Sequence, residues 1–273
     1  MSGLAERIAT ARSVLFVPGD RPDRFPKALA SGADVVVLDL EDAVAIADKD
    51  AARAAVDDYL VSTGVQLMVR VNGTDTPWCD DDLEMLSRHE AAVMIPKAHS
   101  VSQVRGIAGR LAPATPIVAL IETAVGVNAT AEICGCETVV RAAFGSIDLS
   151  AELGVDPDAQ HALQYARSAV VLGSAAAGRR APLDGVTTEL GDAGRLADDV
   201  AHAAQLGFGG KLCIHPRQIA AVHEGFSPSP PELEWARKVT AEAADGKACV
   251  VDGKMVDKPV IDRAARILLR ANR

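Results

Sequence analysis

Eight short runs of apolar, largely β-branched residues recur along the chain and alternate with segments rich in Ala, Leu and charged residues. The runs cover residues 13–19, 33–40, 66–72, 91–98, 116–122, 138–146, 181–187 and 210–216. Because they are continuously apolar rather than alternating, they indicate strands that are buried on both faces. Strands of this kind belong to parallel sheets that are covered by helices.

The segments between the runs have the composition of helices. Seven are expected, at residues 21–30, 48–60, 80–89, 102–111, 128–132, 160–177 and 192–206. In the last one, Leu196, Val200 and Ala203 share one face, as in an amphipathic helix. The alternation predicts an α/β protein, a (β/α)8 TIM barrel. A doubly wound open sheet is the alternative, but no Gly-x-Gly-x-x-Gly follows the first strand, as its dinucleotide-binding form requires.

The length and charge of the chain narrow the classes of function. A chain of 273 residues is typical of one such barrel. The net charge is −9, and this acidic balance argues against a nucleic-acid binder, which usually carries a basic stripe. A small anionic substrate is still compatible, because a site can be positive locally.

The five cysteines are odd in number and lack paired spacings, which argues against a disulfide framework. The N-terminus lacks the apolar segment of a signal peptide, and no stretch approaches the ~18 apolar residues of a membrane helix. We therefore expect a cytoplasmic protein with free thiols and no membrane partner. Cys134 and Cys136 form a Cys-x-Cys pair, which is weak support for zinc without a second pair.

The residues after the eighth run predict a C-terminal extension. A Pro-rich turn with a helix, a hairpin and a terminal helix follow one another at residues 227–239, 247–257 and 258–273. Asp252-Gly253 marks the hairpin turn, and Pro259 lies in the first turn of the last helix. We expect a TIM-barrel catalytic domain over 1–225 and an extension over 226–273. The extension could close over the barrel mouth or cover the site of a neighbouring subunit.

Polar residues gather where the apolar runs end. They are Asp20, Arg21, Asp39, Glu41, Asp42, Arg70, Asn72, Lys97, Glu122, Ser146, Asp148 and His215. In a TIM barrel the carboxyl ends of the strands converge on one opening, which carries the catalytic residues. Structural ion pairs would be scattered more widely, so we expect a functional site at this end.

Glu122 and Asp148 are the candidates for metal binding. They end the fifth and sixth runs, so we expect them on adjacent strands with their side chains close together. A lone acid at the end of a buried strand is costly unless a partner neutralises it. Two carboxylates without a nearby His or Cys pair suit Mg²⁺ or Mn²⁺. The alternative is plain ion pairing of these acids with Arg70 and Lys97.

The other polar residues each have a structural and a functional interpretation. Arg70 can form an ion pair at the barrel end, or it can grip a substrate carboxylate with its planar guanidinium. One acid of the segment 39–42 is expected to order metal-bound water or the arginine. Lys97 is open between the two kinds of role. His215 suits a loop cap better than a general base.

A series of motifs runs in order between about residues 12 and 270. They read SVLFVPGDRPDRFPKAL, VVVLDLEDAV, VRVNG, IPKA, ALIET, GSIDLSAELG, DGV, CIHPRQI and MVDKPVIDRA. Together they resemble the citrate lyase β-subunit-like proteins of the HpcH/HpaI aldolase superfamily. The resemblance implies a Mg²⁺-dependent carbon–carbon lyase acting on a β-hydroxyacyl-CoA ester of the citryl-CoA or malyl-CoA type. It also implies a homo-oligomer, a trimer or a hexamer.

The same resemblance implies roles for single residues. Glu122 and Asp148 match the family's metal ligands, and Arg70 matches the arginine that binds the substrate's carboxylate end. Arg21 looks like a contact for the CoA phosphates. Asp257 is similar to a tail acid that members present to the site of a neighbouring subunit.

Further residues are expected around this centre. Gly145 and Ser146 are expected to contact the substrate, together with Arg70 and Glu122. Asp42 and Lys97 are expected to hold the metal ligands in place without binding the metal themselves. Cleavage would be of the retro-Claisen or aldol type and would give an acyl-CoA and a keto acid. In it, Asp257 would move a proton to or from the thioester carbon, and amide N–H groups around Gly145 would stabilise the developing charge.

Other functions stay open. Relatives often read Gly-Ala-Glu-Asp-Leu where this chain has residues 145–149, so one supporting acid is missing. GSIDLSAELG also resembles the branch of pyruvate aldolases that use free hydroxy-keto acids without CoA. A malyl-CoA thioesterase and a non-catalytic subunit of a lyase complex are further alternatives.

Overall fold

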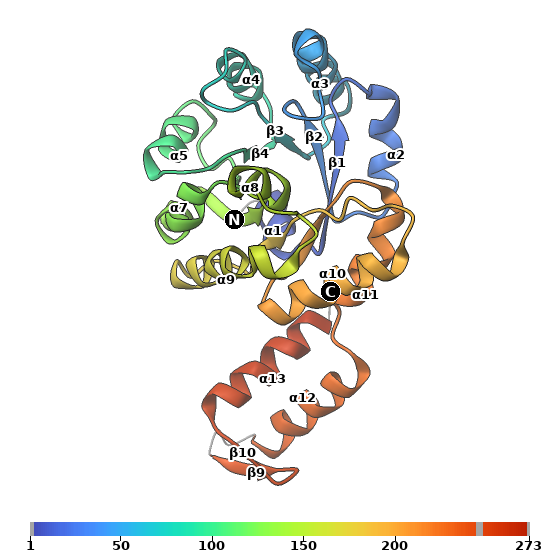
Figure 1. Cartoon of the computed structure of the whole chain (residues 1–273), viewed down its shortest axis with the longest axis vertical. Helices are drawn as coiled ribbons and strands as arrows, with labels where there is room; N and C mark the ends of the chain where they lie inside the picture. Colours follow the sequence, from blue (N-terminus) through green and yellow to red (C-terminus); the bar gives the residue numbers. More distant parts are fainter. Residues whose placement is uncertain (1–2, 244–247, 272–273) are drawn as a thin grey trace. The chain divides into compact units, whose positions relative to one another are not determined.

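The computed structural model describes residues 3–243 and 248–271, and within them eight parallel strands close into a barrel in sequence order (Figure 1). The strands are β1 (Ser13–Pro18), β2 (Val35–Asp39), β3 (Met68–Arg70), β4 (Ala92–Ile95), β5 (Ile117–Ile121), β6 (Val139–Phe144), β7 (Leu183–Asp184) and β8 (Gly210–Cys213). β8 pairs with β1 and closes the ring, which excludes an open sheet. The predicted (β/α)8 TIM barrel is confirmed.

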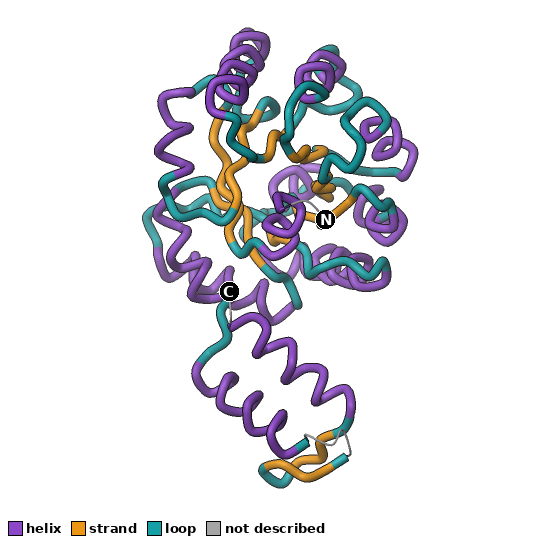
Figure 2. The backbone as a smooth tube through the Cα atoms, turned by 180° about the vertical axis from the view of Figure 1, so that it is seen from behind, coloured by secondary structure: helices purple, strands orange, loops and turns teal. Residues whose placement is uncertain are grey.

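Helices surround the ring of strands (Figure 2). They are α1 (Gly3–Thr10), α2 (Phe25–Leu29), α3 (Lys49–Thr63), α4 (Cys79–Leu86), α5 (Val101–Ala108), α6 (Ala124–Asn128), α7 (Thr130–Gly135), α8 (Ser146–Leu153), α9 (Gln160–Ala176), α10 (Ala193–Leu206) and α11 (Ile219–Phe226). No predicted helix covers α1, α8 or α11, and the predicted helix at residues 128–132 includes only the last residue of α6. At α8 the prediction was wrong because it continued the sixth strand to Ser146, whereas β6 ends at Phe144.

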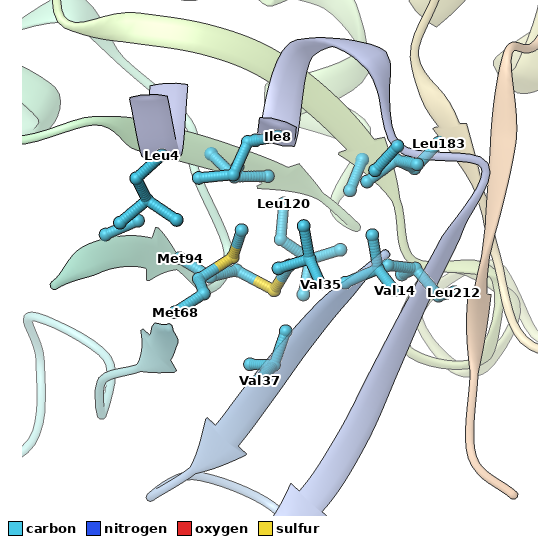
Figure 3. Packing of buried hydrophobic residues seen from close by; sticks show 14 residues of the cluster. Leu4, Ile8, Val14, Val35, Val37, Met68, Met94, Leu120, Leu183 and Leu212 are labelled. Atoms are coloured by element: carbon cyan, nitrogen blue, oxygen red, sulfur yellow. The ribbon is translucent and has the colours of Figure 1, made fainter. Parts of the chain in front are cut away.

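Helix α1 supplies apolar side chains to the core of the barrel. Leu4 and Ile8 of α1 are buried in the same cluster as Met68, Met94 and Leu120 of the strands (Figure 3). The remaining members of this cluster are Ala11, Val14, Val35, Val37, Ala92, Val118, Ala143, Leu183 and Leu212. Small and medium side chains therefore fill the barrel, in keeping with the aromatic content of only 3%.

Arg141 interrupts the apolar sequence of β6 but is satisfied where it lies. Its Nε donates to the Ala181 carbonyl at 2.7 Å, and its Nη1 donates to the Ala11 carbonyl at 2.6 Å. Ala11 lies just before β1 and Ala181 lies just before β7. The guanidinium therefore connects backbone segments at the amino end of the barrel. A buried cation is tolerated there because carbonyl oxygens accept its hydrogen bonds.

A buried ion-pair group holds the two-residue strand β7. Asp184 lies between Arg167 Nε at 2.9 Å and Lys211 Nζ at 3.0 Å. Burial acts to raise the pKa of the Asp184 carboxyl, but the two cations outweigh it and the pKa is lowered. The charged group thus connects β7 to α9 and β8.

The chain separates into two compact units, Met1–Val222 and His223–Arg273. The second contains α12 (Pro230–Glu242), the antiparallel strands β9 (Cys249–Val251) and β10 (Lys254–Val256), and α13 (Lys258–Ala271). The predicted hairpin turn is confirmed: Asp252 and Gly253 have φ of 50° and 74°. Pro259 lies in the first turn of α13, as predicted. Lys247, which the predicted hairpin included, lies outside the described residues.

This second unit has an apolar core of its own. The core consists of Ala236, Val239, Ala243, Val251, Val256, Ala264 and Ile267. Helices α12 and α13 supply most of it and the hairpin supplies the rest. The fold is therefore a TIM barrel with a largely helical C-terminal extension.

Four cysteines, Cys79, Cys134, Cys136 and Cys213, are buried and free. The side chain of Cys249 lies outside the described part of the chain. None of the helices within residues 3–243 and 248–271 is both long and apolar enough to cross a membrane.

Two glycines allow a test of the barrel's closure. A Cβ at Gly210, where β8 begins, would lie 2.6 Å from the Arg12 carbonyl oxygen and 2.7 Å from that of Ala11. Gly210→Ala should therefore destabilise the protein by about 2 kcal/mol or more. Gly106→Ala in α5 is the control, since its added Cβ meets nothing within 4 Å; it should stabilise by roughly 0.5–1 kcal/mol. Denaturant unfolding measures both, and similar effects of the two changes would contradict the packing described here.

Candidate active site

Arg70 is fixed at the mouth of the barrel by Asp39. The register of β2 and β3 places the two residues side by side. Arg70 Nε donates to Asp39 Oδ1 at 2.7 Å, and Nη2 donates to Oδ2 at 2.6 Å. The Asp39 carboxylate also accepts the backbone N–H of Glu41 and of Ala43. This geometry resolves the alternatives for Asp39: it orients the arginine.

The guanidinium of Arg70 has two further contacts. Its Cζ lies 4.9 Å from the centre of the Phe16 ring. Its Nη1 lies 2.9 Å from Glu41 Oε2, in an ion pair whose angle does not give a hydrogen bond. Glu41 Oε2 is consequently a buried oxygen without a hydrogen-bond donor among the described residues. A planar cation packed on a ring and paired on one edge keeps a fixed orientation.

Glu122 follows the last residue of β5 and is 3% exposed. Its Oε1 accepts the backbone N–H of Lys97 at 2.8 Å. None of the ion pairs in the described part of the chain includes Glu122. Burial, together with the charges of Glu41 and Asp148 and against that of Arg70, raises the pKa of the Glu122 carboxyl to about 8. The side chain is therefore an acid that lacks a neutralising cation of its own.

Lys97 bridges two other acids of the site. Its Nζ lies 2.6 Å from Glu41 Oε1 and 3.2 Å from Asp148 Oδ2. Burial acts to lower the pKa of this ammonium, but the hydrogen bond to Glu41 and the surrounding carboxylates raise it overall. Plain ion pairing, the alternative to metal binding, therefore holds for Asp148 and does not hold for Glu122.

The segment from Gly145 to Asp148 differs from the expected strand end. β6 stops at Phe144, Gly145 caps helix α8, and Asp148 lies in the first turn of that helix. The Gly145 N–H donates to the Ile121 carbonyl at 2.9 Å, so it is not free to stabilise charge on a substrate. No side chain caps α8, which leaves the first-turn N–H groups from Ser146 onwards without intrahelical acceptors.

Close packing explains the small residues of this segment. A Cβ at Gly145 would lie 2.4 Å from both Cβ and Oε2 of Glu122. A Cβ at Gly185, just after β7, would lie 2.7 Å from the Oγ of Ser146. Glycine at these positions lets Glu122 and the start of α8 approach the neighbouring strand ends.

A cavity of about 310 Å³ joins these groups at the carboxyl end of the barrel. Its lining includes Asp39, Asp42, Arg70, Glu122, Gly145, Ser146 and Asp148, and apolar side chains of Phe16, Leu120, Phe144, Val186, Leu212 and Ile214. The Asp42 side chain is about half-exposed, and its Oδ2 lies 3.9 Å from Arg70 Nη1. The convergence of these polar groups expected from the sequence is thus present.

A second hollow lies beside this cavity. A groove of about 560 Å³ shares Phe16 and Ile214 with it and is lined by Arg21, Arg24 and Lys27. Arg21 is partly exposed and pairs with Asp23 at 3.2 Å. The groove therefore combines an apolar wall with three cationic side chains.

Two further candidates lie elsewhere. His215 accepts the backbone N–H of Arg217 at 3.1 Å through Nδ1 and caps the short helix Pro216–Gln218. The structure thus gives it the loop-capping role. Asp257 belongs to the C-terminal unit, where its carbonyl accepts the N–H groups that open α13.

The donor set at the mouth suits a hard dication. No group of three or more His, Cys, Asp or Glu side chains in residues 3–243 and 248–271 is arranged to hold a metal by itself. Glu122 and Asp148 supply two carboxylates, with the uncompensated charge of Glu122 and the orphaned Glu41 oxygen nearby. Mg²⁺ commonly takes one or two carboxylates and completes its shell with water and substrate oxygens. The residues present therefore fit this ion.

Comparison with known proteins identifies the family. Residues 12–216 match the family model of HpcH/HpaI aldolase/citrate lyase. A citrate lyase subunit beta-like protein of Mycobacterium tuberculosis is 40% identical over 265 residues, 94% of each chain. The chain belongs to the HpcH/HpaI aldolase/citrate lyase family. As a citrate lyase β-like member of the CoA-ester lyases, it is a carbon–carbon lyase.

Two further known proteins are similar to this chain along nearly their whole length. A (3S)-malyl-CoA thioesterase of Cereibacter sphaeroides is 35% identical and covers 98% of this chain and 97% of its own. The crystal structure of protein CitE from Mycobacterium tuberculosis in complex with magnesium, acetoacetate and coenzyme A has a TM-score of 0.85 and 38% identity. It covers 97% of this chain and 99% of that one.

The raised pKa of Glu122 gives a prediction for the metal-free protein. Because the folded state keeps a proton that the unfolded state loses, stability should fall as the pH rises from 4.5 to about 8. Glu122→Gln should remove this loss, so the variant should melt a few °C above the wild type at pH 9, and the difference should shrink towards pH 5. About 1 kcal/mol corresponds to roughly 2–4 °C for a protein of this size.

Thermal melts in chelator at both pH values measure this effect. Glu132→Gln, at an exposed position of α7, is the matched control and should leave the pH profile unchanged. A Glu122→Gln variant that is less stable than the wild type at pH 9 would show that the carboxylate is well compensated.

Proposed function

We propose that this protein is a Mg²⁺-dependent lyase that cleaves a β-hydroxyacyl-CoA ester of the citryl-CoA or malyl-CoA type to an acyl-CoA and a keto acid. The observation that carries the proposal is the convergence of Glu122, Asp148 and Arg70 on one cavity at the barrel mouth. The relatives that bind magnesium, a keto acid and coenzyme A support it.

Glu122 and Asp148 are the residues that would hold Mg²⁺, or Mn²⁺ in its place. The bound ion would lower the pKa of the substrate's β-hydroxyl and stabilise the oxygen that becomes a ketone. Glu122 is suited to this role by its position, since its Oε1 is fixed by the Lys97 N–H. Asp148 is suited by its exposure, since its carboxylate faces the cavity from the first turn of α8.

Arg70 would bind the carboxylate of the keto-acid half. Asp39 sets the plane of the guanidinium, so an incoming carboxylate meets a donor that needs little reorganisation. The first-turn N–H groups of α8, beginning at Ser146, would donate to the same end of the substrate. Asp42 would support this arrangement from its edge through Arg70, and Lys97 would do so through Glu41.

The basic groove beside the cavity would receive the CoA portion. Phe16 and Ile214 line both hollows, which gives the pantetheine arm of the CoA ester an apolar route between them. Arg21, with Arg24 and Lys27, would bind phosphate groups at the outer part of the groove. Because only a CoA-linked substrate carries phosphates for these cations, the groove favours CoA esters over the free hydroxy-keto acids of a pyruvate aldolase.

The C-terminal extension, residues 226–273, would complete the site of a neighbouring subunit. Asp257, directly before α13, would carry the proton to or from the carbon next to the thioester carbonyl, where the departing acyl-CoA holds the electron pair of the broken bond. The active form would then be a homo-oligomer, a trimer or a hexamer.

A second function has specific support. The similarity to a (3S)-malyl-CoA thioesterase suggests that the same cavity could admit water to the thioester. Cleavage of the carbon–carbon bond releases an acyl-CoA and a keto acid, whereas hydrolysis of the thioester releases free CoA and the intact hydroxy acid. Product analysis with malyl-, citramalyl- and citryl-CoA, each with Mg²⁺, distinguishes the two. Turnover of free hydroxy-keto acids alone would overturn the role of CoA.

Loss of one metal ligand should abolish the reaction. Asp148→Asn should lower Mg²⁺-dependent turnover by at least about 10²-fold, because the amide is a weaker ligand for a hard cation. The melting temperature should change little, since Asp148 is partly exposed. Asp198→Asn, at an exposed position of α10, is the control and should retain activity. Full activity of Asp148→Asn after chelator treatment and Mg²⁺ return would exclude Asp148 as a ligand.

Replacement of Arg70 should act mainly on substrate capture. Lys cannot reproduce the planar fork that pairs with Asp39 and still reaches the cavity. We expect Arg70→Lys to raise KM by about 10-fold to 100-fold, with a smaller effect on kcat. Steady-state kinetics with a CoA ester measures this, and unchanged kcat and KM would remove Arg70 from the site.

A further inference from the structure

Lys97 contacts three of the acids at the carboxyl end of the barrel, and both proposed metal ligands are among them. Its backbone N–H donates to Glu122 Oε1 at 2.8 Å, and its ammonium lies 2.6 Å from Glu41 and 3.2 Å from Asp148. One residue thus binds both proposed metal ligands, one through the main chain and the other through the side chain. A lysine that serves only as a solvated surface charge would not make both of these contacts.

The backbone of Lys97 is strained to make these contacts. Its φ is 48°, in the left-handed region, which a non-glycine residue adopts at a cost of about 1 kcal/mol. The residue lies in the segment that leaves β4. The left-handed turn aims the N–H at Glu122 while the side chain extends to Asp148. Strain of this kind persists where the surrounding contacts require it.

We propose that Lys97 is a positioning residue that acts as a tethered cation: it neutralises Asp148 and Glu41 when the metal is absent and must leave Asp148 when the metal binds. The inference rests on the proposed metal role of Glu122 and Asp148. It adds that the affinity for Mg²⁺ is set by competition with a charge that the chain itself carries.

The two contacts of the ammonium differ in a way that supports an exchange. Glu41 is buried at 6% exposure and lies at the shorter distance, whereas Asp148 is partly exposed and lies farther away. Release of Asp148 alone would leave Lys97 bound to Glu41, so the exchange requires only a small shift of a flexible side chain. The N–H bond to Glu122 is independent of the side chain and keeps that ligand in place throughout.

The test is the affinity of the protein for Mg²⁺, measured by titration calorimetry at pH 8.5 without substrate. Lys97→Met removes the charge and keeps the length of the side chain, so Mg²⁺ should bind at least about fivefold more tightly, because a cation next to the site has been removed. Lys97→Arg keeps the charge and should stay within about threefold of the wild type. Without metal, Lys97→Met should melt at a lower temperature, since Glu41 loses a partner.

Two further variants separate charge from backbone. Lys97→Gly removes both the ammonium and the left-handed strain while the N–H to Glu122 is retained, so it should also bind Mg²⁺ more tightly. Arg88→Met removes one positive charge from the exposed pair with Asp57 and should leave the affinity unchanged.

The outcomes are distinct. If the wild type binds Mg²⁺ and Lys97→Met binds it equally or more weakly, the competition is refuted while the metal site stands. If the wild type itself takes up no Mg²⁺, both the proposed metal role and the tethered-cation role of Lys97 are refuted.

Discussion

The structure depends on the way carboxylates are compensated at the carboxyl end of the barrel. The acids at this opening are Asp39, Glu41, Asp42, Glu122 and Asp148. Among the described residues, Arg70 and Lys97 form ion pairs with all of them except Glu122. Burying a carboxylate without a counter-charge is costly, so its proton affinity rises instead. Glu122 shows this directly, because its pKa is raised to about 8. The site is therefore arranged to receive additional positive charge.

The fold provides this arrangement through register and close approach. Adjacent parallel strands place Asp39 against Arg70, and glycines at 145 and 185 let strand ends and the start of α8 come together. The cluster that fills the barrel beneath this opening is apolar, and the polar groups of the site stand at the strand ends. The same architecture that buries small aliphatic side chains thus concentrates acids at one opening.

Much of this could be predicted from the sequence. The eight apolar runs gave the barrel and its closing order, and the Asp-Gly turn and the proline gave the outline of the C-terminal unit. The ends of the runs gave the set of polar residues that line the cavity. Helix α8 was missed because GSIDLSAELG directly continues an apolar run, and only tertiary packing shows that β6 ends at Phe144.

Which acid pairs with which base at the site could not be predicted from the sequence. Residue types at the strand ends predicted that Arg70 and Lys97 lie near the acids, but not that Asp39 takes Arg70 and that Lys97 takes Glu41 and Asp148. Such choices depend on ångström-scale distances and on a left-handed turn at Lys97. They decide which carboxylate is left without a cation, and hence where a metal ion is favoured.

The most direct test is a crystal structure of the protein grown with Mg²⁺ and pyruvate at pH 8.5. The account predicts a metal ion about 2.1 Å from oxygens of Glu122 and Asp148, with pyruvate bridging the ion and the α8 amides and the Lys97 ammonium away from Asp148. Density without a metal ion, with Asp148 still paired to Lys97 and the Glu122 side chain in its present position, would contradict it.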